Sequence, residues 1–541
     1  MQAVRRLKRV DEVNTTQPER NSTLDPITLE ILWTRLTTVV DEASATFVRT
    51  SFSTLVRDAN DFAVVLTDKH GRSIAQSTKS IPSFISTMPR TIEHFIKEFG
   101  IENMREDDAY VTNDPWLGSG HLNDASLAMP LFRGGELIGF AGVVSHLPDI
   151  GGRLRNPGNK EIYEEGLQIP PMRILREGEP DESLIRMIRA NVRVPDETMG
   201  DFWAQITCCR SLGDNLNTLL DETGIDLDAF ADEVVGRTEQ AMRAAIAELP
   251  DGVYRYEIEN DGPKEFPGGI IRIVCAVTVA GDELIVDYAG SSDQVDLAIN
   301  TVPTYTFAYT AYALKAVLAP WIPNAEGSFI PITVTAPEGS ILNPRHPAST
   351  GSRAMMGHLL PPAVFGALAQ VVPDKVQAVP GSPVSSIQLA SLENDRRYVL
   401  NAFVGAGQGA SSSADGVSAI SFPSNLSNAG VEIIETLAPI EIVRREIRRG
   451  SGGAGEYRGG DGITFEFTLR EGRANGAFVV NRVRSPAEGL AGGGQGATGC
   501  LTINGEPADA GLYSLTEGDT VVLETGGGGG FGPVEKRQAE D

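Results

Sequence analysis

The stretch Ala109–His146 decides how this chain folds, and it reads AYVTNDPWLGSGHLNDASLAMPLFRGGELIGFAGVVSH. Three apolar runs within it are rich in β-prone residues, and they predict strands at 109–112, 127–132 and 137–145. The segment Arg133-Gly134-Gly135-Glu136 separates the last two runs and is typical of the turn that closes a β-hairpin. The stretch therefore predicts neighbouring strands, two of them joined by a tight turn.

Helical and strand patterns occur on both sides of this stretch. Asp25-Pro26 has the residue types that begin a helix, and Gly100 has the type that ends one. Apolar residues at helical or alternating spacing fill the segments between such boundaries. Helices are expected at 25–52, at 89–99, within 199–248, at 303–319 and at 356–371, and further strands at 62–66, at 73–76 and within 254–289. The expected fold class is a mixed α/β (α+β), multi-domain protein.

The composition changes near residue 450. Of the 58 glycines, 24 lie between Gly450 and Gly532, among short β-prone runs, which predicts a glycine-rich, β-rich C-terminal region with many turns. The domains expected from these patterns are a flexible tail (1–24), an α/β region with the candidate metal site (25–198), a helical segment (199–250), a central α/β region (251–449), a glycine-rich β region (450–533) and a second tail (534–541).

Charge and cysteine content exclude several classes of protein. The chain has 541 residues, with 46 Lys and Arg against 72 Asp and Glu, for a net charge of −26. This balance argues against nucleic acid or an anionic membrane surface as a partner. The four cysteines form no CxxC pair, and the basic N-terminal segment lacks the apolar core of a secretory signal. We therefore expect a soluble, cytoplasmic protein with reduced thiols.

The strongest candidate for chemistry is a repeated His-x-x-Asp pattern. It occurs as His121-Leu122-Asn123-Asp124 and as His146-Leu147-Pro148-Asp149, and it uses two of the six histidines. Imidazole and carboxylate groups are ligands for Zn or Mn, and strand ends can bring His121, Asp124 and His146 together around one ion. Asp114 and Asp149 are available to accept a hydrogen bond from a ligating imidazole. The alternative is that the aspartates cap turns and the histidines pack as ordinary polar residues.

The glycine clusters and the other histidines are weaker candidates. Gly526–Gly530 lacks the Lys-Ser/Thr and the following helix of a phosphate-binding loop, and 452–460 is more typical of a group of turns. The four remaining histidines are isolated in sequence, which favours ordinary packing: His70, His94, His346 and His358. The chain shows no obvious place to bind ATP.

Ordered motifs along nearly the whole chain resemble the hydantoinase B family. They include DPITLEILWTRL (25–36), NDPWLGSGHLND (113–124), SHLPDIGG (145–152), DYAGSSDQV (287–295), GGAGEYRGGDG (452–462) and TGGGGGFGP (525–533). The family contains the B-type subunits of ATP-dependent hydantoinases, half of the 5-oxoprolinases, and subunits of acetone and acetophenone carboxylases. The resemblance implies a divalent ion, Zn or Mn, held by His121, Asp124 and His146.

The resemblance also implies a division of labour. A hydantoinase A-type ATPase subunit would bind ATP and phosphorylate the oxygen of a small-molecule cyclic amide or ketone substrate, and the intermediate would react at the metal. From its proximity in the sequence, and not from the resemblance, Asp114 or Asp149 is expected to orient a ligand or shuttle a proton. One departure is that many relatives carry a histidine shortly after Ile-Pro, where this chain reads Ile81-Pro82-Ser83-Phe84.

Three functions stay open from the sequence. The expected one is the metal-bearing subunit of a heteromeric ATP-dependent hydrolase of hydantoin, lactam or oxoproline-like substrates. The alternatives are a subunit of an ATP-dependent ketone carboxylase and a non-catalytic scaffold for the ATPase subunit. The length of the chain favours the hydrolase over the acetone carboxylase type.

Overall fold

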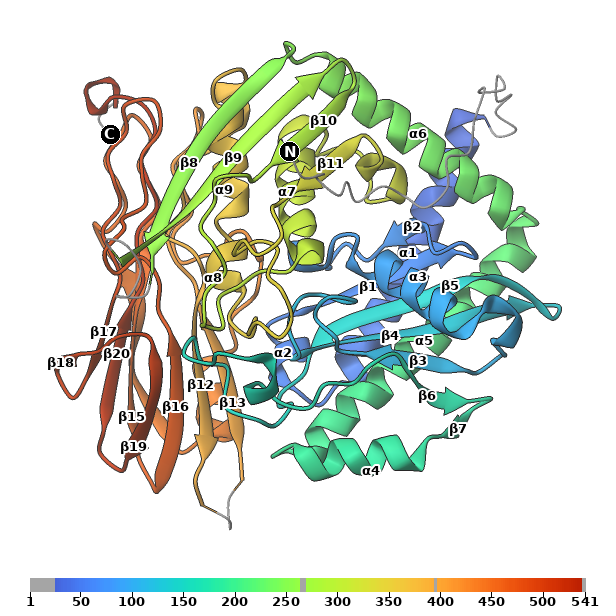
Figure 1. Ribbon diagram of the computed structural model, residues 1–541, viewed down its shortest axis with the longest axis horizontal. Helices are drawn as coiled ribbons and strands as arrows, with labels where there is room; N and C mark the ends of the chain where they lie inside the picture. The colour runs from blue at the N-terminus through green and yellow to red at the C-terminus, as the bar shows by residue number, and fades with distance from the viewer. Residues whose placement is uncertain (1–24, 263–268, 394–396, 538–541) are drawn as a thin grey trace.

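The computed structural model describes residues 25–262, 269–393 and 397–537 (Figure 1). The expected tail at 1–24 and the last residues of the expected tail at 534–541 therefore lie outside the described residues. The described residues form helices and four sheets, which confirms the predicted fold class. The division into domains at the predicted boundaries stays a prediction.

The N-terminal sheet is antiparallel and has the strand order β2-β1-β5-β4-β3-β6-β7. Its two long central strands, β4 (Asp124–Arg133) and β5 (Glu136–His146), are the predicted hairpin, each a few residues longer than the apolar run. The other strands are β1 (Phe62–Asp68), β2 (Ser73–Gln76), β3 (Ala109–Thr112), β6 (Met172–Arg176) and β7 (Glu179–Pro180).

Helices cover both faces of this sheet. On one face, the helices α1 (Pro26–Thr50) and α5 (Pro195–Thr223) share an apolar core with strand residues that include Val64, Leu127 and Val143. On the other face, α3 (Thr87–Phe99) shares a second apolar core with the alternate strand residues, such as Val65 and Val144. Because both faces are buried, β1 is apolar at nearly every position instead of alternating. The smaller helices of this region are α2 (Thr54–Arg57) and α4 (Glu182–Asn191).

The central region is built on a second sheet with the order β11-β10-β9-β8. Its strands are β8 (Gly252–Asp261), β9 (Ile270–Ala280), β10 (Glu283–Asp287) and β11 (Ile332–Thr335). In β9 burial alternates along the strand, so one face packs on the core of this region and the other faces outward. That core includes α6 (Leu227–Ala247), α7 (Pro303–Leu318), α8 (Ala354–Gly357) and α9 (Leu360–Leu368).

One predicted helix is divided in two. The sequence pattern predicts a single helix at 356–371, whereas α8 ends at Gly357 and α9 begins at Leu360. The reason is Pro361-Pro362, which lack the N–H groups that a continuing helix would use and fit only its first turn. The break leaves His358 between the two helices, where it reaches a cavity described below.

The C-terminal region consists of two packed sheets, ordered β13-β12-β16-β19 and β14-β15-β20-β17-β18 (Figure 1). This confirms the predicted β-rich end. The strands are β12 (Ser385–Ser391), β13 (Val399–Val404), β14 (Ile440–Arg448), β15 (Gly462–Leu469), β16 (Arg473–Val479), β17 (Cys500–Ile503), β18 (Glu506–Pro507), β19 (Gly511–Thr516) and β20 (Thr520–Glu524). The helix α10 (Val431–Leu437) lies between β13 and β14 in the sequence.

The glycine run at 526–530, for which the sequence favours a tight structural loop, has no helix or strand of its own and packs closely against other backbone segments. Its main chain bonds to neighbours on several sides: the Gly528 N–H donates to Gly460 O (2.9 Å), and the Gly529 N–H to Val379 O (2.8 Å). A Cβ on Gly527, Gly528 or Gly529 would lie 1.9–2.0 Å from a neighbouring carbonyl oxygen. Glycine is therefore needed here for close approach of backbones and not for turns.

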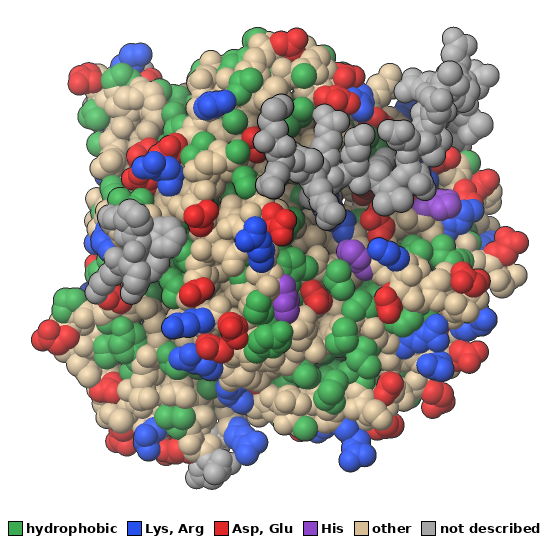
Figure 2. Space-filling view, viewed as in Figure 1, with side chains coloured by type: hydrophobic (Ala, Val, Ile, Leu, Met, Phe, Trp, Pro, Cys, Tyr) green, Lys and Arg blue, Asp and Glu red, His purple; other side chains and the backbone are tan. Residues whose placement is uncertain are grey.

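The surface shows mixed charge. Lys, Arg, Asp and Glu side chains are interspersed among hydrophobic ones over the face seen in Figure 2. Within the described residues, no helix is both long and apolar enough to cross a membrane.

Candidate metal centre

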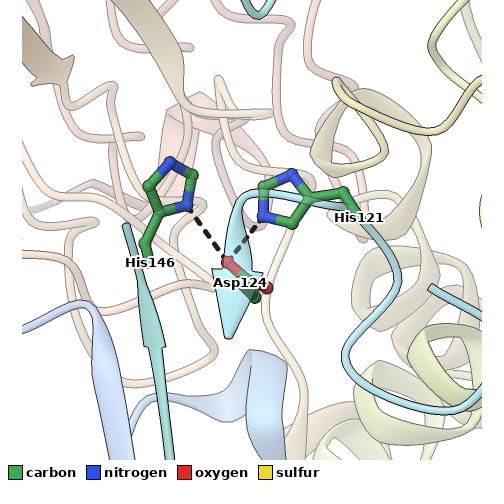
Figure 3. Close-up of side chains that lie close together, drawn as sticks. All are labelled: His121, Asp124 and His146. Atoms are coloured by element: carbon green, nitrogen blue, oxygen red, sulfur yellow. Dashed lines mark hydrogen bonds and ion pairs between the residues drawn. The ribbon is translucent and has the colours of Figure 1, made fainter. Parts of the chain in front are cut away.

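Strand pairing brings the three predicted ligands together. Asp124 is the first residue of β4 and His146 the last of β5, and the two are direct partners in the antiparallel register. His121 lies in the loop before β4, after Gly120, whose φ of 106° suits glycine. The β-hairpin thus places both histidines beside one carboxylate at the end of the sheet (Figure 3).

The three side chains point at one another and are buried. His121 Nε2 lies 2.6 Å and His146 Nδ1 lies 3.1 Å from the same oxygen, Asp124 Oδ1. Each of the three residues is only 2% exposed. One candidate ligand atom from each of them lies within 4.8 Å of the other two, a grouping that a small adjustment can close around a metal ion.

The hydrogen bonds of His121 favour a cation at this place. Its Nδ1 lies 3.1 Å from Gly351 O and its Nε2 faces Asp124 Oδ1, so both ring nitrogens meet acceptors. Burial lowers the pKa of His121 to about 3, and Arg353 lowers it too, against the opposing effect of Asp124. A neutral imidazole has a single N–H, so one nitrogen always presents a lone pair to an acceptor. A metal ion on Nε2, with Nδ1–H donating to Gly351 O, satisfies both.

Arg353 fixes the other oxygen of Asp124. Its Nη2 donates to Asp124 Oδ2 (2.6 Å), its Nε donates to Ser119 O (2.9 Å), and Ser119 Oγ donates to Asp124 Oδ2 (2.7 Å). Burial raises the pKa of Asp124, but the charge of Arg353 and the hydrogen bonds that the carboxylate accepts together outweigh it, so its pKa lies well below the usual range. Asp124 is therefore an ionised carboxylate with Oδ1 left for the histidines.

A cavity of about 50 Å³ opens beside these three residues. One water molecule needs roughly 10–15 Å³ of such a volume, so the cavity has space for a few waters or one small chemical group. Its walls come from all parts of the chain: Asp61, Ile81, Ser83, Phe84, His121, Asp124, His146, Arg155, Tyr305, Gly351, Ser352, Arg353, Ala354, His358, Val384, Ser386, Phe403, Ser424, Leu426 and Val479.

Asp61 is a second acidic group in this cavity that the sequence analysis did not single out. It directly precedes β1, and its Oδ2 lies 3.8 Å from His146 Nδ1. Burial raises the pKa of Asp61 to about 6, against the opposing effect of His146. Such a carboxyl group can exchange a proton near neutral pH. Its sequence distance from the His-x-x-Asp pattern hides it, because β1 is brought to β5 only by sheet pairing.

A hydrogen-bonded chain of side chains forms another part of the wall. Ser83 Oγ lies 2.7 Å from Tyr309 Oη, which lies 2.9 Å from His358 Nε2. The Val384 N–H donates to His358 Nδ1 (3.3 Å), so the ring hydrogen of neutral His358 is on Nε2. Burial lowers the pKa of His358 to about 3. The substituted segment Ser83-Phe84 therefore lies in the wall of the candidate site.

The two other predicted residues, Asp114 and Asp149, lie outside the cavity lining. Asp114 accepts hydrogen bonds from the Trp116 N–H (2.9 Å) and from Gln168 Nε2 (2.7 Å). Asp149 accepts one from Arg193 Nη1 (2.6 Å) and one from the main-chain N–H of Arg193. These contacts hold loops in place, and a part for either aspartate in catalysis stays a prediction.

Comparison with known proteins gives related sequences over almost the full chain. The family model described as hydantoinase B/oxoprolinase matches residues 25–534. The beta chain of the caprolactamase of Pseudomonas jessenii is 31% identical over 95% of this chain and 92% of its own length. The B-type subunit of a putative D-/L-hydantoinase of a Pseudomonas species is 29% identical over 96% of this chain and 91% of its own.

Two solved structures share the fold. The ATP-dependent caprolactamase from Pseudomonas jessenii superposes with a TM-score of 0.86 at 28% identity, over 95% of this chain and 92% of that one. A nucleotide-free acetone carboxylase superposes with the same TM-score at 21% identity, over 95% of this chain and 76% of that one, and shows the likeness of the fold alone.

Proposed function

Because the chain belongs to the hydantoinase B/oxoprolinase family, we propose that it is the metal-bearing subunit of a heteromeric, ATP-dependent cyclic amide hydrolase. An ATPase subunit of the hydantoinase A type phosphorylates the amide oxygen of a hydantoin, lactam or oxoproline-like substrate. The intermediate is then hydrolysed in the cavity around His121, Asp124 and His146. The hydantoinase and caprolactamase relatives are themselves named as single subunits, which supports the pairing with another one.

One observation carries the proposal. Two buried imidazoles face a single carboxylate oxygen beside a small cavity, and His121 has acceptors at both ring nitrogens. Without a cation, one ring nitrogen of neutral His121 faces an acceptor and has no proton to donate to it. A cation bound between that nitrogen and the carboxylate would remove this unfavourable buried contact. Zn or Mn fits the two nitrogen ligands and one oxygen ligand.

The cavity residues have distinct parts in this chemistry. A divalent ion held by His121, Asp124 and His146 would polarise a substrate oxygen and lower the pKa of water. Arg353 keeps Asp124 ionised and correctly turned, and Asp61 accepts a proton from the attacking water. Phosphorylation of the amide oxygen makes the ring carbon electrophilic, so water adds to it. The proton that the water loses is passed to the ring nitrogen, and the ring C–N bond breaks as the amine leaves. The acyl phosphate that remains is then hydrolysed to a carboxylate and inorganic phosphate.

The first test measures the metal. We expect about one Zn or Mn per chain in purified wild type and none in a folded His121→Ala/His146→Ala variant. A His70→Ala/His94→Ala variant is the matched control, because it removes two histidines that do not line the cavity. A metal-free wild type, or a metal content that is equal in both variants, contradicts the proposed site.

The second test measures turnover with an ATPase subunit of the hydantoinase A type. Opening of a hydantoin or lactam ring should require ATP, this chain and Asp124. Full activity of an Asp124→Ala variant would instead support a scaffold without catalytic function. ATP turnover that requires bicarbonate and a ketone would support a ketone carboxylase.

A further inference from the structure

Arg155 is one of two arginines that line the cavity. The main-chain N–H of Arg155 donates to Gln388 Oε1 (2.6 Å), but among the described residues its guanidinium group has no hydrogen-bond or ion-pair partner. The guanidinium lies over the Phe403 ring, 5.4 Å from the ring centre. An arginine has five N–H donors in a planar fork, so this one is free to bind an oxyanion.

Arg353 shows the contrast within the same cavity. Its guanidinium is occupied by Asp124 Oδ2 and Ser119 O and is stacked on Tyr305 at 4.1 Å. Arg353 therefore has a structural part, in holding a metal ligand. Arg155 has no comparable contact in the described part of the chain. Burial lowers its pKa against the opposing attraction of Asp61, so a guanidinium group without a hydrogen-bond partner is costly here.

Hydroxyl groups provide further donors in the same wall. Ser352 is 3% exposed, and within the described part of the chain its buried Oγ has no hydrogen-bond partner. Ser386 also lines the cavity, whereas the Ser424 hydroxyl in the same wall donates to Ser421 O (2.9 Å). A guanidinium group together with the Ser352 hydroxyl is a donor set suited to anionic oxygens.

A count of charges favours a dianion. Arg155 and Arg353 carry two positive charges, and Asp61 and Asp124 carry two negative ones when all four are ionised. The charges of these four side chains then cancel, so a bound divalent ion gives the cavity a net charge of about +2. A phosphoryl group carries close to two negative charges near neutral pH, whereas a carboxylate carries one.

We propose that Arg155 and the hydroxyl of Ser352 form a binding site for the phosphoryl group of the ligand that meets the metal. This assignment rests on the proposed function for the origin of the phosphoryl group, which is the ATP-dependent activation of the substrate. The cavity is large enough for such a group and not for a whole substrate. The ring of the substrate therefore extends beyond the cavity, with its phosphoryl end inside.

The test is calorimetric titration of the metal-loaded, full-length protein with inorganic phosphate, with no ATPase subunit present. Wild type should bind one phosphate per chain, and Arg155→Met should bind it about 10- to 100-fold more weakly at unchanged metal content. Arg153→Met is the matched control, because Arg153 pairs with Glu164 and its side chain is 50% exposed. Its affinity should equal that of wild type.

Acetate distinguishes a phosphoryl from a carboxylate site, and it should bind more weakly than phosphate. Equal or tighter binding of acetate overturns the proposal, and so does an unchanged phosphate affinity in Arg155→Met. If Arg155→Met does not fold, Arg155→Lys replaces it, because lysine keeps the charge but lacks the planar donor group of arginine. An unchanged phosphate affinity in Arg155→Lys also overturns the proposal. Phosphate binding without ATP-dependent hydrolysis would refute the proposed function and leave this site intact.

Discussion

Replacement of Gly528 by alanine tests whether the packing of the glycine run at 526–530 depends on close backbone contact. A Cβ at this position would lie 2.0 Å from Gln408 O and 2.3 Å from Gln408 C. Ordinary contacts of this kind are about 3.4 Å or longer, so the two segments must separate by more than 1 Å. The contact is with backbone, so no side-chain rotation can relieve it.

The magnitude follows from the bonds that such a shift would break. The Gly528 N–H donates to Gly460 O (2.9 Å), the Gly453 N–H to Gly528 O (2.8 Å), and the Gly460 N–H to Gln408 O (2.8 Å). Loss of two of these three buried bonds, at about 1–3 kcal/mol each, gives a destabilisation of about 2–6 kcal/mol. This is a large part of the total stability of an ordinary domain.

Urea unfolding, followed by far-UV circular dichroism, measures this loss against graded controls. Gly430 has φ −62° and ψ 154°, and a Cβ there would have its nearest neighbour at 3.5 Å, so Gly430→Ala should lie within about 1 kcal/mol of wild type. Gly494→Ala, with a contact of 3.2 Å to Ala454 O, should be intermediate. If Gly528→Ala is as stable as Gly430→Ala, the reasoning about backbone contact is refuted.

Three further predictions follow from the electrostatics of the structure. Arg353→Met should weaken metal binding about 10- to 100-fold, because Asp124 loses the hydrogen-bond donor that orients its carboxylate. Competition with a chelator measures the metal affinity, and an unchanged affinity contradicts this prediction. Burial raises the pKa of Glu165 from 4.5 to about 7, so the folded state holds the proton more tightly. The free energy of unfolding should then fall by about 3 kcal/mol from this group as pH rises from 4.5 to 7. Urea unfolding at pH 5 and pH 8 should show this fall in wild type but not in Glu165→Gln. If the free energy of unfolding changes equally with pH in both proteins, Glu165 is not its source. A thiol reagent should label at most Cys500 in the native protein, and all four cysteines in urea, since burial raises the pKa of the other three thiols; rapid labelling of more than one native thiol contradicts this.

Local patterns were enough to predict most of the elements of the fold. The helix behind Asp25-Pro26 and the β4–β5 hairpin follow from capping residues, turns and apolar runs, all of which act within a few residues. The predicted continuous helix at 356–371 was wrong where Pro361-Pro362 begin a new helix. For the glycine runs at 452–460 and 526–530 the sequence favoured turns and a tight loop. Their close backbone packing joins segments that are far apart in the sequence, so no local pattern predicts it.

The residues of the candidate site likewise include some that local patterns predict and some that they do not. His121, Asp124 and His146 were predicted from their spacing and from the family resemblance, since one hairpin carries two of them and the loop before it the third. Asp61 and His358 line the same cavity but stand isolated in the sequence. No local pattern marks them, because their neighbours in space come from other elements.

Local periodicity and ordered motifs are enough to predict the family, the fold class and the residues that face one another across the β4–β5 hairpin. The distant side chains that line the candidate site become visible only once the chain is folded. Arg353 reaches Asp124 from 229 positions along the chain, and Arg155 lines the cavity without a protein partner for its guanidinium among the described residues. Burial and pairing of such charges depend on how the cores pack together, and a residue's neighbours in sequence carry no record of that packing.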